Sequence, residues 1–233
     1  MKRIIYTFCA VAALMIAAVS CKAVLDSLAT NPVFELAGST VYDGQSAFLG
    51  TTATCKIGWQ TNKSDIVLLN YDENGKNCVA TFTLANNIIT DVEITATNLD
   101  DDAVDPYTGT FTVAPWKLTV FQKVGDDWVQ VSRTNEDYFL WSERKAEGSN
   151  NFKVQMQALK SNGTYEDINN IVYRMKLKNG SHKIDWQGSA LTEDLKGEST
   201  ACSIEFSMDK PSETKNITAK LGTKTKEIRI LNK

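Results

Sequence analysis

The chain has little of what most enzymes need. Its 233 residues include a single histidine, His182, so any Ser-His-acid catalytic set would have to use it. His182 follows an Asn-Gly-Ser turn at residues 179–181, where a polar residue is expected without a catalytic role, and no G-x-S-x-G elbow precedes any serine. Paired carboxylates for glycoside hydrolysis require no sequence signature, but no pair stands out among the 28 acidic residues. The sequence therefore predicts a protein that is not an enzyme and uses no cofactor.

Patterns for metal binding are also scarce. None of the five cysteines forms a C-x-x-C pair, and with one histidine a zinc site is disfavoured. Cys9 and Cys21 belong to the N-terminal segment considered below, which leaves Cys55, Cys78 and Cys202. Because three is an odd number, at most one disulfide can form among them. We consider a Cys55–Cys78 disulfide, with three reduced cysteines in the core as the alternative.

Acidic residues cluster most densely at Asp100, Asp101, Asp102 and Asp105. Calcium prefers several hard oxygens in a flexible loop. Calcium loops usually space their acids at alternate positions around a glycine, and this run does not. We expect a solvated loop without a metal, and these four carboxylates are the candidate ligands should a metal bind.

The charge and the hydropathy of the rest of the chain exclude two classes of partner. Lysine and arginine total 25 against 28 acidic residues, a formal net charge of −3. The chain has no basic patch that could neutralise phosphates, so we expect that it does not bind nucleic acid. After the first twenty residues, no apolar run is long enough to span a bilayer as a helix.

The N-terminus, by contrast, has a clear export pattern. Lys2 and Arg3 precede an uncharged, apolar run from Ile4 to Val19, which ends in small residues. This is the layout of a secretory signal peptide, and the run is shorter than the roughly 20 residues of a membrane-spanning helix. We therefore expect residues 1–20 to be a signal peptide.

The stretch Ala18-Val19-Ser20-Cys21 resembles a bacterial lipobox, in which aliphatic and small residues precede the cysteine. Ordinary signal-peptidase cleavage before Cys21 is the alternative, although it does not require a cysteine there. The resemblance implies that Cys21 carries a diacylglyceryl thioether and an N-acyl chain, which together anchor a protein stably. Residues 21–32 would tether the protein to a membrane of the cell envelope, which we expect to be the outer membrane.

From Val33 onward the chain shows strands and turns. Runs rich in Val, Ile, Thr, Phe and Tyr are separated by Asn, Asp and Gly. Hairpins are predicted for residues 66–84, 116–131, 152–165 and 171–186, and two more strands for residues 217–231 around Gly222. An Asn-Asn turn at residues 86–87 predicts that residues 88–97 lie next to the strand before them. This spacing predicts an all-β protein, an antiparallel β-sandwich or two.

A faint internal repeat suggests two similar modules. Trp59 in Ile-Gly-Trp-Gln is echoed by Trp186 in Ile-Asp-Trp-Gln, and the strand that begins at Cys78 is echoed by the one that begins at Cys202. Two β modules in tandem explain the order and offset of these matches. We place them at residues 33–144 and 151–233. A single large β domain over residues 33–233, with chance matches, is the alternative.

Five tryptophans are candidates for the core or for ligand contact. Trp59 and Trp186 occupy echoed positions and are expected in the core. Trp128 follows a tight turn, and Trp141 lies in a charged segment. Exposed tryptophans are common in binding sites, so Trp128 and Trp141 are the candidate ligand-binding residues.

The signal peptide, the lipobox and the Asn/Thr/Asp-rich β body together resemble the small surface or periplasmic lipoproteins of Bacteroidota. This resemblance implies a lipid-anchored protein with a binding or structural role, whose partner is a glycan or another envelope protein. One alternative is a glycan-binding accessory lipoprotein. Another is a fimbrillin-like pilus or adhesion subunit; such subunits mature by cleavage after an N-terminal arginine, whereas the first arginine after Cys21 is Arg133.

Overall fold

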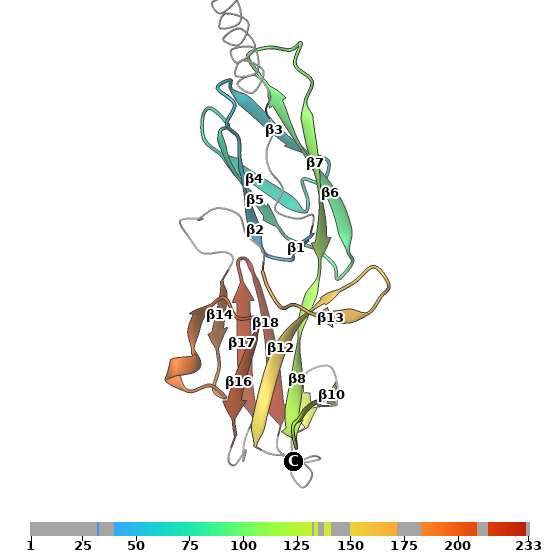
Figure 1. Cartoon of the computed structure of the whole chain (residues 1–233), viewed down its shortest axis with the longest axis vertical. Helices are drawn as coiled ribbons and strands as arrows, with labels where there is room; N and C mark the ends of the chain where they lie inside the picture. The colour runs from blue at the N-terminus through green and yellow to red at the C-terminus, as the bar shows by residue number, and fades with distance from the viewer. Residues whose placement is uncertain are drawn as a thin grey trace, which may run out of the picture.

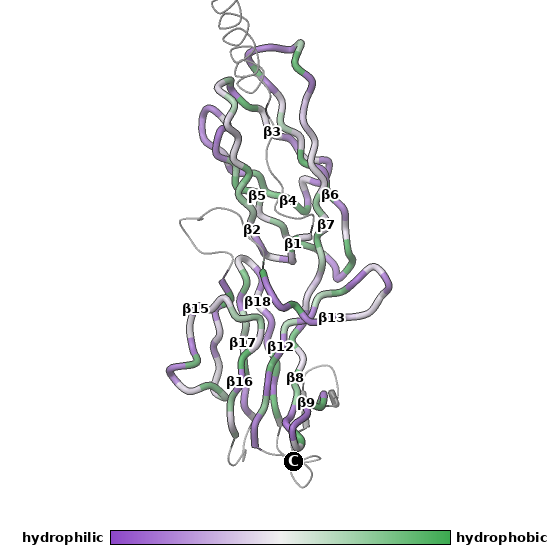
Figure 2. Tube along the Cα trace, viewed as in Figure 1, coloured by the Kyte–Doolittle hydropathy of each residue, from purple (hydrophilic) through white to green (hydrophobic). Residues whose placement is uncertain are grey.

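A computed structural model describes most of the chain from Thr40 onward. It covers residue 32 and residues 40–131, 133–134, 138–140, 150–171, 183–208 and 214–231. Within these residues the regular structure is β-strand throughout, apart from one 3₁₀ turn, η1 (Glu193–Leu195). Hydrophobic and hydrophilic residues alternate along many of the strands, as expected where one face of a sheet is buried (Figure 2). The predicted all-β, antiparallel sandwich class is confirmed, although two of the described strand pairs are parallel.

The first half of the chain forms two small sheets. The first sheet has the order β1-β7-β6-β3; β1 and β7 run parallel, and its remaining strand pairs are antiparallel (Figure 1). The second sheet has the order β2-β5-β4 and is antiparallel. The strands are β1 (Thr40–Tyr42), β2 (Ser46–Gly50), β3 (Ile57–Thr61), β4 (Val67–Tyr71), β5 (Asn77–Phe82), β6 (Thr90–Asn98) and β7 (Tyr107–Ala114).

The second half forms two larger sheets. One has the order β10-β11-β18-β17-β14-β15; in the other, β13-β12-β8-β9, the strand β16 pairs with the remaining part of β12. The strands are β8 (Trp116–Val124), β9 (Asp127–Gln130), β10 (Arg133–Thr134), β11 (Tyr138–Leu140), β12 (Asn151–Leu159), β13 (Tyr165–Asp167), β14 (Ile184–Gln187), β15 (Gly197–Ser199), β16 (Ser203–Ser207), β17 (Lys215–Leu221) and β18 (Lys224–Leu231).

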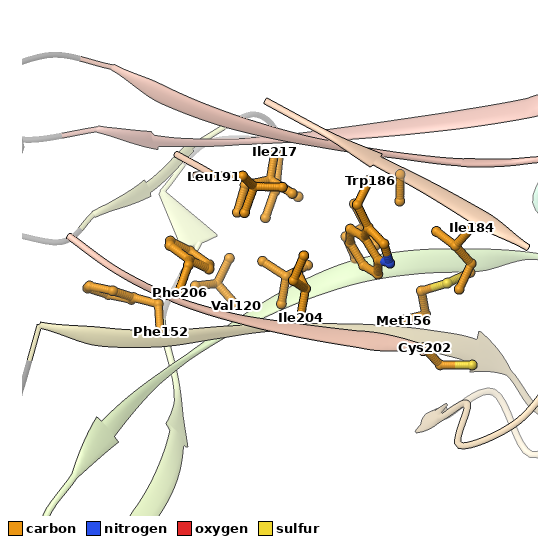
Figure 3. Packing of buried hydrophobic residues seen from close by; sticks show 14 of the residues in the cluster. Val120, Phe152, Met156, Ile184, Trp186, Leu191, Cys202, Ile204, Phe206 and Ile217 are labelled. Carbon is orange, nitrogen blue, oxygen red and sulfur yellow. The ribbon is translucent and has the colours of Figure 1, made fainter. Parts of the chain in front are cut away.

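Each pair of sheets encloses its own hydrophobic core. One cluster of buried residues runs from Val41 to Val113 and the other from Trp116 to Ile230. In the second core, Trp186 and Ile217 project from one sheet towards Ile204 on the other (Figure 3). We call these two parts the first and the second unit.

The boundary between the cores falls at Pro115, whereas the sequence placed the end of the first module at residue 144. The difference concerns the β8–β9 hairpin, which follows β7 directly. β8 pairs along most of its length with β12, and that long-range pairing carries the hairpin into the second core.

The two units share a strand arrangement. The order β1-β7-β6-β3 corresponds to β11-β18-β17-β14, and in each case the first pair is parallel. Trp59 lies opposite Ala96 on the neighbouring strand, and Trp186 lies opposite Ala219 in the same way. The echoed tryptophans thus occupy equivalent places in two sheets, which supports the tandem interpretation.

A polar contact joins the two units. Asp43, in the turn between β1 and β2, is almost fully buried. Its carboxylate accepts a hydrogen bond from the Leu84 amide at 2.8 Å and lies 3.2 Å from Lys224 Nζ, while its backbone oxygen accepts one from Trp116 Nε1 at 2.8 Å. Lys224 Nζ also donates to the Leu84 carbonyl at 2.9 Å.

The Cys55–Cys78 disulfide considered from the sequence is not formed. Cys55, Cys78 and Cys202 are all buried thiols. Burial raises the pKa of all three and brings that of Cys78 to about 12. Cys78 lies on β5 with its side chain fully enclosed, so it acts as a small apolar core residue.

Candidate ligand-binding face

The outer face of the β8-β9-β12-β16 sheet brings aromatic and charged side chains together. Cross-strand pairing sets Trp128 opposite Lys123, and Phe121 opposite Lys153. Lys153 is in turn opposite Glu205 on β16. Successive residues of a strand point to opposite sides, so these side chains share the face that is turned away from the core.

Lys153 connects the two aromatic rings of this face. Its Nζ lies 5.0 Å from the centroid of the Phe121 ring and 5.3 Å from that of the Trp128 ring. Both distances fall within the range of a cation–π contact, which contributes about 0.5–1 kcal/mol at an exposed site. The contact orients the rings, and a ligand can displace the ammonium at small cost.

A hollow of about 240 Å³ lies beside the Trp128 ring. It is lined by Lys123, Trp128, Asn151, Glu205, Phe206 and Ser207. The Ser207 hydroxyl donates to Asn151 Oδ1 at 2.7 Å, which holds the amide in place. The hollow is smaller than the roughly 300–1,000 Å³ of sites that enclose drug-sized ligands, so it suits one ring of a longer molecule that lies along the sheet.

Trp128 differs from the buried tryptophans. Trp59, Trp116 and Trp186 are at most 5% exposed, and the indole N–H of each donates to a backbone carbonyl. Trp128 is half-buried on the edge strand β9. The other tryptophan predicted to contact a ligand, Trp141, lies outside the described residues, as does His182.

The acidic loop after β6 is described, and two of its carboxylates accept hydrogen bonds from backbone amides of the protein. Asp100 Oδ2 accepts from the Lys56 amide at 2.8 Å, and Asp101 Oδ1 accepts from the Ala103 amide at 3.0 Å. Asp102 and Asp105 are exposed. In the described part of the chain, no group of three His, Cys, Asp or Glu side chains is placed to hold a metal ion.

The sequence singled out Trp128 as a candidate ligand-binding residue but did not predict its neighbours. Phe121 and Lys153 are far apart in the chain, and the β8–β12 pairing brings them together. The alternation of each strand gives the side to which each residue points, but not which strands are adjacent. Glu205 and Asn151 were missed for the same reason.

Nowhere in the described ranges is there a helix of the length and apolar character that crossing a bilayer requires.

The comparisons with known proteins give distant structural likenesses only. No protein-family model matches the chain, and no curated protein matches it. Among solved structures, the chain is similar to domains 5–6 of the S-layer protein SbsC, with 16% identity, 87% of this chain and 99% of that chain covered, and a TM-score of 0.25. It is also similar to the I9–I11 tandem of titin, with 12% identity, 83% and 62% covered, and a TM-score of 0.33.

A third likeness is to the SGBP-B protein of a Bacteroides ovatus mixed-linkage glucan utilization locus, solved with a heptasaccharide. Identity is 12%, coverage is 88% of this chain and 47% of that chain, and the TM-score is 0.26. The chain spans 32% of the length of a larger SbsC fragment, domains 4–9, that it also matches. At such scores these likenesses decide nothing about the ligand.

Proposed function

We propose that this protein is a non-enzymatic, lipid-anchored component of the bacterial cell envelope that binds a carbohydrate across the outer face of β8, β9 and β12. The observation that carries the proposal is the half-buried Trp128 beside Phe121, Lys153 and the hollow of about 240 Å³. The signal-peptide pattern and the lipobox-like cysteine at residue 21 support the location in the envelope.

The chemistry of the face suits a sugar ring. The C–H groups on one side of a pyranose ring pack against an aromatic face, while its hydroxyls need donors and acceptors around the rim. The Trp128 indole supplies a large, rigid apolar surface. Asn151 and Glu205 offer acceptors and Lys123 offers a donor at the rim of the same hollow, so one ring can be held by stacking and by hydrogen bonds together.

The experiment measures binding of the purified full chain to a panel of soluble neutral and acidic polysaccharides, by affinity electrophoresis and by quenching of tryptophan fluorescence. Trp128→Ala should weaken binding at least about tenfold, because large aromatic residues often dominate the energy of a binding site. Phe121→Ala should weaken it less, because Phe121 lies further from the hollow.

Tyr71→Ala is the matched control, since Tyr71 is an aromatic residue on β4 of the first unit with 48% of its surface exposed. It should leave binding unchanged. If no polysaccharide binds, or if Trp128→Ala and Tyr71→Ala behave alike, the face is not a carbohydrate site. Thermal unfolding of each variant checks that the fold is retained.

A further inference from the structure

In the first unit, β5 has a strand on each side. β2 pairs with one edge of β5 and β4 with the other, both antiparallel. The Thr83 amide donates to the Ile66 carbonyl, and the Asp72 amide donates to the Asn77 carbonyl. Since hydrogen-bonded pairs recur at every second residue of an antiparallel ladder, the main-chain groups of Val79 and Thr81 also face β4.

In the second unit, β16 is the counterpart of β5. The strand from Cys202 to Phe206 echoes that from Cys78 to Phe82. In both strands the cysteine and the phenylalanine are buried in the core. Among the described strands, β16 pairs with β12, which corresponds to the β2 side of β5. No described strand occupies the place that β4 takes in the first unit.

The chain itself explains this difference. In the first unit, the segment between the tryptophan strand and β5 folds into β4 and pairs with β5. In the second unit, the corresponding segment forms η1 and β15, and β15 pairs with β14 in the opposite sheet. Only residues 200–202 then separate β15 from β16, too few to supply a strand beside β16.

The outer edge of β16 therefore presents main-chain groups to the space beside it. The Met156 amide donates to the Cys202 carbonyl, and the Met208 amide donates to the Asn150 carbonyl. By the same alternation, the amides and carbonyls of Ser203, Glu205 and Ser207 point away from β12. The groups of Ser203 and Glu205 are the counterparts of those that Val79 and Thr81 use to bind β4.

A hollow of about 440 Å³ lies between β16 and the η1–β15 segment. Its lining includes Trp186, Leu195 and Ile204, which belong to or pack on the second core, so it has an apolar floor. Proteins protect strand edges with proline and with charged side chains, lysine above all. β16, Ser-Ile-Glu-Phe-Ser, contains neither proline nor lysine, and its one charged residue is Glu205.

The rim of this hollow is acidic. Its carboxylates are Asp194 and Glu205, and its one lysine, Lys196, is paired with Glu193. Glu198 also lines the hollow, but its carboxylate lies 3.6 Å from Lys183 Nζ, on the face of β15 turned away from the core. A strand that lies here would turn alternate side chains to the apolar floor and to the acidic rim.

We propose that the edge of β16 accepts an extended segment of a partner protein in which apolar and basic residues alternate, pairing with it as β4 pairs with β5. The main-chain groups of Ser203, Glu205 and Ser207 supply the ladder, the floor takes the apolar side chains, and the carboxylates select the basic ones. Such strand addition is a common mode of peptide recognition.

The test uses the full chain and a dye-labelled eight-residue peptide of alternating valine and lysine, followed by fluorescence anisotropy. Glu205→Pro removes an outward-facing amide and no bond to β12, so it should weaken binding at least about tenfold while the fold is kept. Thr61→Pro is its matched control, because the bond from the Asn62 amide to the Glu93 carbonyl places the Thr61 amide on the open edge of β3. It should leave binding unchanged.

A second pair of variants isolates the charge. Asp194→Asn with Glu205→Gln should weaken peptide binding severalfold and reduce the loss of affinity that added salt causes. Glu73→Gln with Asp102→Asn, both exposed in the first unit, should leave peptide binding unchanged. A valine–glutamate peptide should bind much more weakly. Glu205 lines both hollows, so its variants can affect both kinds of binding. Trp128→Ala should weaken only carbohydrate binding and leave peptide binding intact, which distinguishes the two sites.

Three outcomes overturn the proposal. One is undiminished binding to Glu205→Pro. Another is that the wild-type chain binds no peptide but self-associates, and that Glu205→Pro abolishes the self-association. A second copy of the chain would then occupy the edge. The third is no peptide binding together with a large loss of thermal stability in Glu205→Pro, which would show that the chain fills this edge itself.

Discussion

The contact between the two units predicts a large effect of a single substitution, Lys224→Met. The Asp43 carboxylate is 2% exposed and the Lys224 side chain 28% exposed. Removing one partner of a fully buried ion pair costs about 3–5 kcal/mol, because the other charge stays buried without compensation. Since water reaches Lys224 in part, we expect a loss of about 2–3 kcal/mol in the free energy of unfolding.

Denaturant unfolding followed by tryptophan fluorescence measures this loss. Lys160→Met is the matched control, because Lys160 and Glu166 form an ion pair at 3.8 Å with both side chains about half exposed. Such a pair contributes about 0–1 kcal/mol. A double-mutant cycle with Asp43→Asn should give a coupling energy of about 1–2 kcal/mol. If Lys224→Met costs no more than Lys160→Met, the junction does not stabilise the protein as argued.

Four further predictions concern other parts of the chain. Trp59→Ala and Trp186→Ala should each cost about 3–5 kcal/mol in denaturant unfolding, and a cost below about 0.5 kcal/mol would remove both from the core. The Cys78 thiol should resist alkylation until the protein unfolds. In the folded protein its pKa is raised from 9.0 to about 12, so between these pH values the unfolded state binds fewer protons than the folded state. The free energy of unfolding should therefore fall as the pH rises through that window. A free energy of unfolding that does not change with pH there would contradict this. Gly222→Ala should lower the melting temperature, because its φ is +57° and a Cβ would lie 2.0 Å from the Gly44 carbonyl oxygen; an unchanged melt would contradict that close approach. Cys21→Ser should abolish fatty-acid labelling and membrane association, and labelling that persists would show that Cys21 is not the anchor.

Local hairpins were the most predictable part of the fold. Residues 67–71 and 77–82 pair across the turn at Asp72–Gly75 as predicted, and β8–β9, β12–β13 and β17–β18 also form as predicted. In each case a short turn joins strands whose apolar residues alternate, so pattern and chain connectivity lead to the same answer. At Gly75 the φ of +69° and the nearby Ile57 carbonyl leave no room for a side chain.

Pairing beyond a hairpin was less predictable. Residues 88–97 were expected beside the strand that precedes them, and that expectation was wrong. β6 pairs with β3 and β7 in the opposite sheet, because the connection of seven residues between β5 and β6, residues 83–89, allows the chain to cross between sheets. The predicted partner of the β14 strand, residues 171–177, lies largely outside the described residues, and β14 pairs with β15 and β17.

The sequence by itself determined the all-β class, the local hairpins and the burial of Trp59 and Trp186. Each depends on residues close together in the chain, whose alternation and turn chemistry are visible in one segment. The tertiary structure alone decided that β8 belongs to the second core, that Lys153 lies over Phe121 and Trp128, and that β16 has an open edge. These depend on which distant strands are neighbours, and strand propensity is similar for many partners; the choice is made by the packing of the whole sandwich.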